Sequence, residues 1–139
     1  MKKQKIEITQ GCILKKVNQD YCVSTDNLAV VLDGCGSGEH SEIGAQRMGE
    51  AIRKNSKEIT SGRKLLSTIV KVFRDIFREG VNAKEFRDKY LFTLLVCIEK
   101  DENFEVHNAG DGYIITIDNN KNVKYIGINV DFVIYNVRC

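Results

Sequence analysis

The stretch that decides the fold is LAVVLDGCGSG, residues 28–38 of the chain. Residues 28–32 form a continuous apolar run, which is typical of a strand buried on both faces. The run ends at Asp33, and three closely spaced glycines follow, which disfavour regular structure and permit unusual backbone angles. The sequence therefore predicts a buried strand that delivers a carboxylate into a glycine-rich loop.

The segments around this strand divide into a β-like start, a helical middle and a β-like end. Residues 6–16 and 21–25 are predicted to pair as short strands. The strands expected in the second half cover residues 91–98, 104–107, 113–117, 123–126 and 132–137. Strands, two helices and again strands indicate an α+β domain in which helices pack against antiparallel sheet.

Two helices are predicted in the middle of the chain. Ser41 is expected to cap the first, which runs to about Lys57 or Glu58. The second begins at Ser61, and Gly80 lies where a C-terminal cap is expected. Its apolar residues recur with helical spacing, and we interpret them as a face directed to the core: Leu65, Leu66, Ile69, Val70, Phe73, Ile76 and Phe77.

Composition excludes several classes of function. With 139 residues, 42% hydrophobic and 29% charged, the chain has the balance of one globular domain. Its 21 basic and 19 acidic residues leave a net charge of +2, which gives no reason to expect nucleic-acid or membrane partners. No apolar segment follows the basic start, so a cytoplasmic location is expected. The five cysteines are odd in number and lack C-x-x-C spacing, which disfavours a zinc site or disulfide framework.

Three carboxylates lie at the ends of predicted elements. Asp20 follows the first strand region, Asp33 ends the apolar strand, and Asp111 lies between two glycines. Mg²⁺ and Mn²⁺ favour oxygen ligands of this kind, and Gly34 lets a backbone carbonyl or a phosphate come close. Asp-Gly and Gly-Asp are also common turn dipeptides, so plain turns in an unrelated α+β domain remain an alternative. The glycine-rich loop is neither a Walker P-loop nor G-x-G-x-x-G, which disfavours a nucleotide cradle.

Four elements in order resemble the type 2C family of metal-dependent protein serine/threonine phosphatases. VNQD (17–20) and LAVVLDGCG (28–36) resemble its Asn-Glu-Asp element and its strand ending in Asp-Gly-x-Gly. The small residues of SEIGA (41–45) suit the helix that follows there. FTLLV (92–96) resembles the Thr-rich strand of the family, and NAGDG (108–112) resembles its Gly-Asp turn.

The resemblance implies a fold, a reaction and a set of site residues. The expected fold is an antiparallel β-sandwich with flanking helices, formed by residues 1–139 as a single domain that is incomplete at its C-terminal end. Asp33 would bridge two Mn²⁺ or Mg²⁺ ions, the Gly34 carbonyl would ligate one of them, Asp20 would hold a metal-bound water network, and Asp111 would lie near an accessory metal. A hydroxide between the cations would attack phosphoserine or phosphothreonine, with Asp33 and Asp20 as catalytic residues. The expected partners are a phosphorylated protein substrate and a cognate Ser/Thr kinase.

Some positions depart from the family pattern. Gln19 replaces the Glu and supplies no charge, although its amide can still hydrogen-bond a metal-bound water. Lys15 stands at the phosphate-gripping position in place of Arg, and Cys35 stands where some members have His. Asp131 is the only acidic residue after Asp118, so the late carboxylates of the family are not matched. A non-catalytic phosphatase-like module that binds a partner is therefore the alternative hypothesis.

Overall fold

The computed structural model describes residues 18–101, 103–128 and 133–138, and all structural statements here refer to them. A first hairpin consists of β1 (Asp20–Ser24) and β2 (Leu28–Gly34). Three helices follow: α1 (Glu42–Lys54), α2 (Gly62–Arg78) and α3 (Ala83–Lys89). The chain continues as β3 (Phe92–Glu99), β4 (Asn103–Ala109), β5 (Gly112–Ile117), β6 (Val123–Ile128) and β7 (Val133–Arg138).

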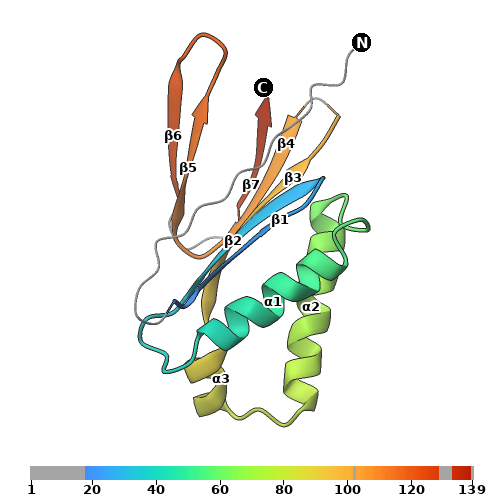
Figure 1. Cartoon of the computed structure of the whole chain (residues 1–139), viewed down its shortest axis with the longest axis vertical. Helices are drawn as coiled ribbons and strands as arrows, with labels where there is room; N and C mark the ends of the chain where they lie inside the picture. The colour runs from blue at the N-terminus through green and yellow to red at the C-terminus, as the bar shows by residue number, and fades with distance from the viewer. Residues whose placement is uncertain (1–17, 102, 129–132, 139) are drawn as a thin grey trace.

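The strands form two separate antiparallel sheets. The larger has five strands in the order β1-β2-β3-β4-β7, whereas β5 and β6 form a two-stranded sheet of their own. The three helices lie on one side of the larger sheet, and α1 packs against β1 and β2 (Figure 1). The α+β class with helices on antiparallel sheet is confirmed. A full sandwich of two facing sheets is not evident within the described segments.

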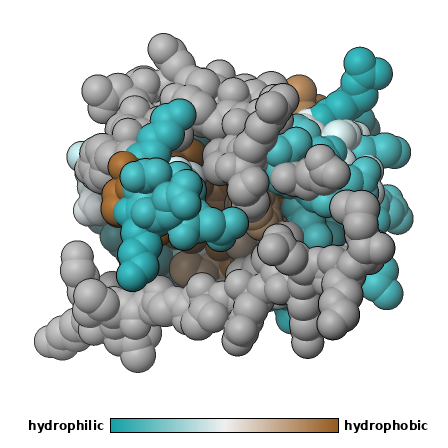
Figure 2. All heavy atoms as spheres, turned by 90° about the horizontal axis from the view of Figure 1, so that it is seen from above, coloured by the Kyte–Doolittle hydropathy of each residue, from teal (hydrophilic) through white to brown (hydrophobic). Residues whose placement is uncertain are grey.

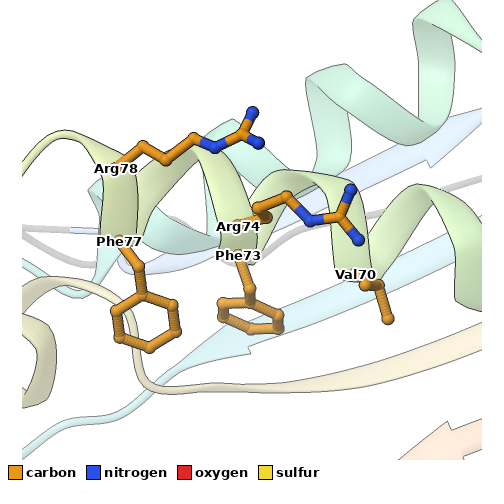
Figure 3. Close-up of a pocket in the computed structure, with 5 residues that line it drawn as sticks. All are labelled: Val70, Phe73, Arg74, Phe77 and Arg78. Atoms are coloured by element: carbon orange, nitrogen blue, oxygen red, sulfur yellow. The ribbon is translucent and has the colours of Figure 1, made fainter.

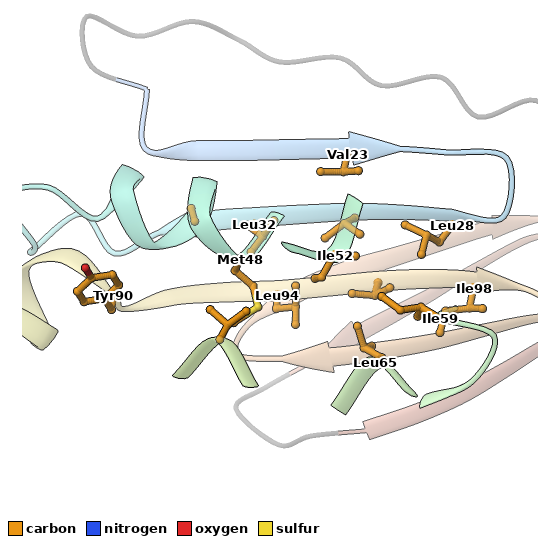
Figure 4. Packing of buried hydrophobic residues seen from close by; sticks show 14 of the residues in the cluster. Val23, Leu28, Leu32, Met48, Ile52, Ile59, Leu65, Tyr90, Leu94 and Ile98 are labelled. Atoms are coloured by element: carbon orange, nitrogen blue, oxygen red, sulfur yellow. The ribbon is translucent and has the colours of Figure 1, made fainter. Parts of the chain in front are cut away.

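The core lies between the helices and one face of the larger sheet. Leu28, Val30 and Leu32 of β2 are almost fully buried and belong to one apolar cluster with Met48 and Ile52 of α1 (Figure 4). The cluster takes further residues from the neighbouring strands and helices: Val23, Ala45, Ile59, Leu65, Val72, Ile76, Tyr90, Leu94, Val96 and Ile98. Burying this surface is the main favourable term in folding.

The prediction that residues 28–32 are buried on both faces is wrong. Val31, between two core residues, keeps 49% of its surface exposed, because the described helices cover only the opposite face. Seen from the end of the molecule, hydrophilic side chains gather at the outside, and apolar residues lie deeper between them (Figure 2). The continuous apolar run therefore reflects a second face that is apolar without being fully covered.

Helix α1 differs from its prediction at both ends. It stops at Lys54 because Asn55 takes a non-helical conformation and its side-chain amide donates to the carbonyl of Ala51 at 2.7 Å. Residues 55–58 then form turns. Ser41 occupies the N-cap position, but its side chain makes no capping hydrogen bond and is fully buried instead.

Helix α2 agrees with its prediction, whereas α3 was not predicted. The Ser61 hydroxyl accepts from the Lys64 amide, and Gly80 has a φ of 81°, as a glycine after a helix often does. Helix α3 has seven residues and is capped by Asn82, whose side chain accepts from the Glu85 amide at 2.9 Å. So short a helix leaves little periodicity to detect.

The strands of the described residues lie where they were predicted, with ends shifted by at most two residues. The shift at β1 matters, because Asp20 is the first residue of that strand and not a residue before it. The predicted strand at residues 6–16 lies outside the described residues. No helix in the described segments is long and apolar enough to cross a membrane.

Candidate functional site

Asp20 and Asp33 are brought together by the pairing of β1 with β2. They are direct Cα partners in this antiparallel register, so their side chains project from the same face of the sheet. Tyr21 and Leu32, the next pair along, lie on the opposite face with α1, where the Tyr21 hydroxyl donates to Glu50. Both carboxylates are therefore on the face away from α1, and both residues are exposed.

The strand next to β2 extends this row of residues. Thr93 of β3 is the Cα partner of Asp33, so Asp20, Asp33 and Thr93 lie side by side across three strands. The register also puts them at one end of the sheet, away from the turn at residues 25–27. Sequence analysis placed Thr93 only in a Thr-rich strand; its position beside Asp33 follows from a long-range register that no local pattern reveals.

Gly34 is required by a close approach of the chain to itself. Its amide donates to the Gln19 carbonyl at 3.1 Å, and a Cβ built on Gly34 would lie 2.6 Å from that oxygen and 2.7 Å from the Ser41 hydroxyl. No side chain fits there without movement of the backbone. The glycine thus allows the chain to turn directly after Asp33.

The loop after Gly34 is fixed by neighbouring elements. The Cys35 amide donates to the Leu91 carbonyl at 2.9 Å, and the His40 amide donates to the Asp88 carbonyl at 3.0 Å. Gly38 is buried against the same Asp88 carbonyl, where a Cβ would lie 2.7 Å away. The end of α3 and the start of β3 therefore set the course of the loop beside the two carboxylates.

Gln19 helps to hold this loop. Its side-chain amide nitrogen donates to the Gly38 carbonyl at 3.1 Å, and its backbone carbonyl accepts from Gly34. The contact of Gln19 with a metal-bound water stays a prediction. The structure gives Gln19 a second role, which is to hold the loop. The signal in the sequence was the amide itself, since Gln can donate where the family's Glu cannot.

Asp111 lies in the turn between β4 and β5, and the residues around it are tightly placed. Gly110 has a φ of 104°, and a Cβ on it would meet Thr93 Cγ2 at 2.7 Å. The buried Asn108 side chain donates to the Gly110 carbonyl at 2.6 Å. The turn that carries Asp111 is therefore seated against Thr93, the residue beside Asp33.

The described residues bring the predicted site together only in part. Asp20 and Asp33 are adjacent, but no group of three or more His, Cys, Asp or Glu in the described ranges is placed to hold a metal ion. Asp111 thus lies near the row without joining a cluster with Asp20 and Asp33. Lys15 and Asp131 lie outside the described residues, so their proposed roles stay predictions.

The Cys35 thiol lies in the loop after β2 and has a hydroxyl beside it. The thiol lies 3.0 Å from the Ser37 hydroxyl. Hydrogen bonding to Ser37 holds the pKa of the Cys35 thiol below its ordinary value, and the nearby charge of Asp33 only partly opposes this. The residue that replaces the family's His thus carries a more acidic thiol than an isolated cysteine.

Comparison with known protein families matches residues 14–136 to Protein phosphatase 2C. The chain belongs to this family. The match includes Asp20, Asp33, Gly34 and Asp111 and ends within β7. The alternative of an unrelated domain with plain turns is therefore wrong. Comparison with curated proteins gave no match.

Solved phosphatase structures share the fold. The Mycobacterium tuberculosis serine/threonine phosphatase PstP/Ppp superposes with a TM-score of 0.65 at 16% identity, over 84% of this chain and 50% of that one. PppA, a regulatory component of the type VI secretion system in Pseudomonas aeruginosa, gives 0.65 at 13% identity, over 90% and 66%. The PstP catalytic domain in complex with two manganese ions gives 0.61 at 15% identity, over 82% and 50%.

The phosphatase 2C relatives are longer than the matched part. The chain spans about half the length of the mycobacterial phosphatase and about two thirds of PppA. At these identities, the superpositions establish a common fold for the matched part alone.

The donor set at the end of β1 and β2 suits a hard divalent cation. Two exposed carboxylates on neighbouring strands repel each other, since opposed Cβ atoms in such pairs are about 5 Å apart. A divalent cation offsets this repulsion, and carboxylate and carbonyl oxygens are the ligands that Mn²⁺ and Mg²⁺ favour. Asp20, Asp33 and the Gly34 carbonyl therefore fit part of a coordination sphere of this kind.

Proposed function

We propose that this chain forms part of a protein phosphatase that removes phosphate from phosphoserine or phosphothreonine with the help of Mn²⁺ or Mg²⁺. The observation that carries the proposal is the row of Asp20, Asp33 and Thr93 across three strands, with the Gly110–Asp111 turn seated against it. Family membership supports the same reaction. The proposal includes a second layer of a sandwich, which would cover the face of the sheet on which Val31 is half exposed.

The residues of the proposed site have separate tasks. Asp33 and Asp20 would hold the cations, with the Gly34 carbonyl as a further ligand, and Asp111 would lie beside an accessory cation. The bound cations would supply an activated water as nucleophile and offset the charge that develops on the phosphate. Lys15 would attract the phosphate group, and Gln19 would orient water while it holds the loop through Gly38.

The fixed loop explains why these residues can act together. Productive geometry requires that groups at the reacting centre be held in place by their surroundings. Here Gly34 and Gly38 allow close backbone contacts, and hydrogen bonds to Leu91 and Asp88 fix the loop on the side of α3 and β3. We expect a phosphorylated protein as substrate and a Ser/Thr kinase as its counterpart in the cell.

The decisive experiment is hydrolysis of a phosphothreonine peptide and of p-nitrophenyl phosphate, with and without Mn²⁺. We expect Mn²⁺-dependent turnover that Asp33→Asn abolishes. The matched control is Asp26→Asn, which removes an exposed charge from the turn at the other end of the same hairpin. If Asp33→Asn retains turnover, the proposed role of Asp33 is wrong, and if the unaltered chain shows no turnover, this chain is not a phosphatase by itself.

A second candidate function is that of a non-catalytic phosphatase-like module. It is favoured by Gln19, whose amide nitrogen is already engaged with Gly38, and by the lack of a three-ligand cluster among the described residues. Calorimetric titration with Mn²⁺ separates the two. Binding of two ions that Asp33→Asn removes would favour the enzyme, whereas no binding would favour the module.

A further inference from the structure

Helix α2 has two apolar stripes, and only one of them faces the core. Leu65, Val72 and Ile76 are buried in the core cluster, with Ile69 packed against it. The second set, which we call the outer stripe, consists of Leu66, Val70, Phe73 and Phe77, of which Phe73 is half-buried and also packs against the core cluster. Its spacings of four, three and four residues are those of a heptad seam, the pattern that packs one helix against another.

Most of the outer stripe is open to solvent. Leu66, Val70 and Phe77 keep 49%, 44% and 58% of their surface exposed. Such a contiguous apolar strip is unusual on a protein surface and marks an interaction site when it is rimmed by polar groups. The prediction that the outer stripe faces the core is wrong for Leu66, Val70 and Phe77, whereas Phe73 does pack against the core cluster.

The stripe lines a groove of about 530 Å³ whose walls are Val70, Phe73, Arg74, Phe77 and Arg78. The two guanidinium groups extend along one edge, and the two phenyl rings project from the helix below them (Figure 3). The Phe77 ring stacks on Phe86 of α3 with centroids 5.3 Å apart, and the Phe73 ring stacks on Phe92 at 6.2 Å. The apolar floor of the groove is therefore held in place before any partner arrives.

The charges on α2 define which partner suits this groove. The helix carries five basic side chains and a single acidic one, Asp75, which pairs with Arg78 at 3.9 Å. Lys71, Arg74 and Arg78 follow one another along the edge next to the outer stripe at three- and four-residue intervals. A partner with carboxylates opposite this edge is attracted, and one with basic residues there is repelled.

We propose that the outer stripe is the docking surface for an amphipathic helix of a partner protein, with apolar residues at heptad spacing and Asp or Glu beside them. The stripe extends over about 17 Å, since eleven residues separate Leu66 from Phe77 at about 1.5 Å each. Three turns of a partner helix therefore cover it. This surface lies on the helical side of the sheet, whereas Asp20 and Asp33 lie on the opposite face, so the proposal is independent of the proposed function.

A second copy of this chain fits less well than an acidic helix. A two-fold contact through α2 would bring the same surface of both copies together. The basic edge of one copy would then face the basic edge of the other, where like charges are costly. The charges on α2 thus favour an acidic partner helix over a second copy of the chain.

The test uses the full chain and designed peptides of about 16 residues, long enough to cover three helical turns. One labelled peptide has Leu at heptad positions and Glu on its flanks, a second has Lys in place of Glu, and a third has the Glu sequence scrambled. Fluorescence anisotropy at low salt should show the Glu peptide bound at least tenfold more tightly than the other two. Equal binding of the scrambled or Lys peptide would overturn the proposal.

Two double variants with the same change of charge locate the binding. Arg74→Glu/Arg78→Glu should weaken binding of the Glu peptide about tenfold and strengthen binding of the Lys peptide. Lys54→Glu/Lys57→Glu changes exposed positions at the end of α1 and in the turn after it. This variant should change the affinity for neither peptide by more than about twofold. Leu66→Ser should weaken the Glu peptide in a chain whose circular dichroism is unchanged.

The remaining outcomes are also decisive. Equal effects of the two double variants would overturn the proposal, because binding would then depend on net charge alone. Sedimentation that shows a dimer, dissociated by Leu66→Ser and unaffected by the Glu peptide, would overturn it in favour of a second copy of the chain.

Discussion

The Cα atoms of Asp20 and Asp33 are direct partners across the β1–β2 pairing, so two carboxylates lie side by side on one face of the sheet. β1 begins at Asp20 and β2 ends one residue after Asp33, whereas the turn at residues 25–27 lies at the other end of the hairpin. Like charges in such a pair destabilise the folded chain unless a cation joins them. Stability and cation binding should therefore change together at this position.

Asp20→Asn should stabilise the folded chain in the absence of divalent cations and abolish its stabilisation by Mn²⁺. Removal of one of two paired like charges is worth about 0.2–1 kcal/mol. Urea denaturation in EDTA and in Mn²⁺ measures both effects. Asp26→Asn is the control, since it removes an exposed carboxylate from the same hairpin without touching the pair. A similar response of both variants would contradict a local effect.

Gly34→Ala should destabilise the chain, whereas Gly36→Ala should have little effect. A Cβ at Gly34 would meet the Gln19 carbonyl at 2.6 Å, but the nearest atom to a Cβ at Gly36 is Gln19 Oε1 at 4.0 Å. Forcing a methyl group into a packed site costs about 1–3 kcal/mol. The free energy of unfolding in urea distinguishes the two. Equal losses of unfolding free energy in the two variants would contradict this prediction. Either the loop would tolerate neither change, or a shift of Gln19 would relieve the close approach at Gly34.

Gly110→Ala should displace the turn that carries Asp111. Its φ of 104° strains any residue with a Cβ, at a cost of about 1–2 kcal/mol, and the new methyl group would also strike Thr93 Cγ2. Thr93→Ser removes that methyl group but keeps the Cβ of residue 93, which would lie 2.9 Å from the new methyl group, so the double variant should recover only part of the steric loss and none of the backbone part. Thermal unfolding of the two single variants and the double variant forms the cycle, and additive losses would argue against contact between the two residues.

Glu105 gives the chain a predictable dependence on acid. Burial alone would raise the pKa of its carboxyl, but hydrogen bonds from the Gly62 amide, His107 and Lys100 outweigh burial and lower that pKa from its ordinary 4.5. A carboxyl whose pKa is lower when folded stabilises the chain above its unfolded pKa, and this contribution is lost as the pH falls through the folded pKa. The chain should therefore lose stability below about pH 4.5.

Glu105→Gln tests this assignment. Loss of hydrogen bonds to a charged group should cost about 1.5–3 kcal/mol at pH 7, and the stability lost between pH 5 and pH 3 should become smaller. Urea denaturation at a series of pH values measures both. Glu58→Gln, exposed in the turn after α1, is the control. An unchanged pH profile in Glu105→Gln would remove Glu105 as the cause.

The positions of most helices and strands could be predicted from the sequence, because residues close together in the chain determine them. The helical spacing in α2, its Ser61 cap and the apolar β2 run were sufficient to locate these elements. The sequence was not sufficient to predict which faces of the sheet are covered, since a run of apolar residues does not tell whether a second layer lies over it. The two-stripe character of α2 escaped for the same reason: both stripes have helical periodicity, and only tertiary packing distinguishes them.

The candidate site was predictable as a set of residue types but not as an arrangement. Carboxylates at the ends of predicted elements suggested Asp20, Asp33 and Asp111, and family resemblance assigned their roles. The Asp20–Asp33 register depends on how the hairpin pairs, and the contact of Gly110 with Thr93 joins different strands. The roles of Lys15 and Asp131 stay predictions from sequence.

The position of Asp33 in the sheet has a consequence for which cations the site accepts. Its strand is paired on both sides, by β1 and by β3, whereas Asp111 is carried by a turn between two separate sheets. Asp33 is thus fixed by neighbouring strands on both sides, whereas the position of Asp111 depends on how one turn is seated against Thr93. Mg²⁺ demands a near-ideal octahedron of fixed radius, whereas a larger ion tolerates a looser set. Selectivity among divalent metals should therefore be tuned through the length and stiffness of the turn, with the central strand as a constant reference.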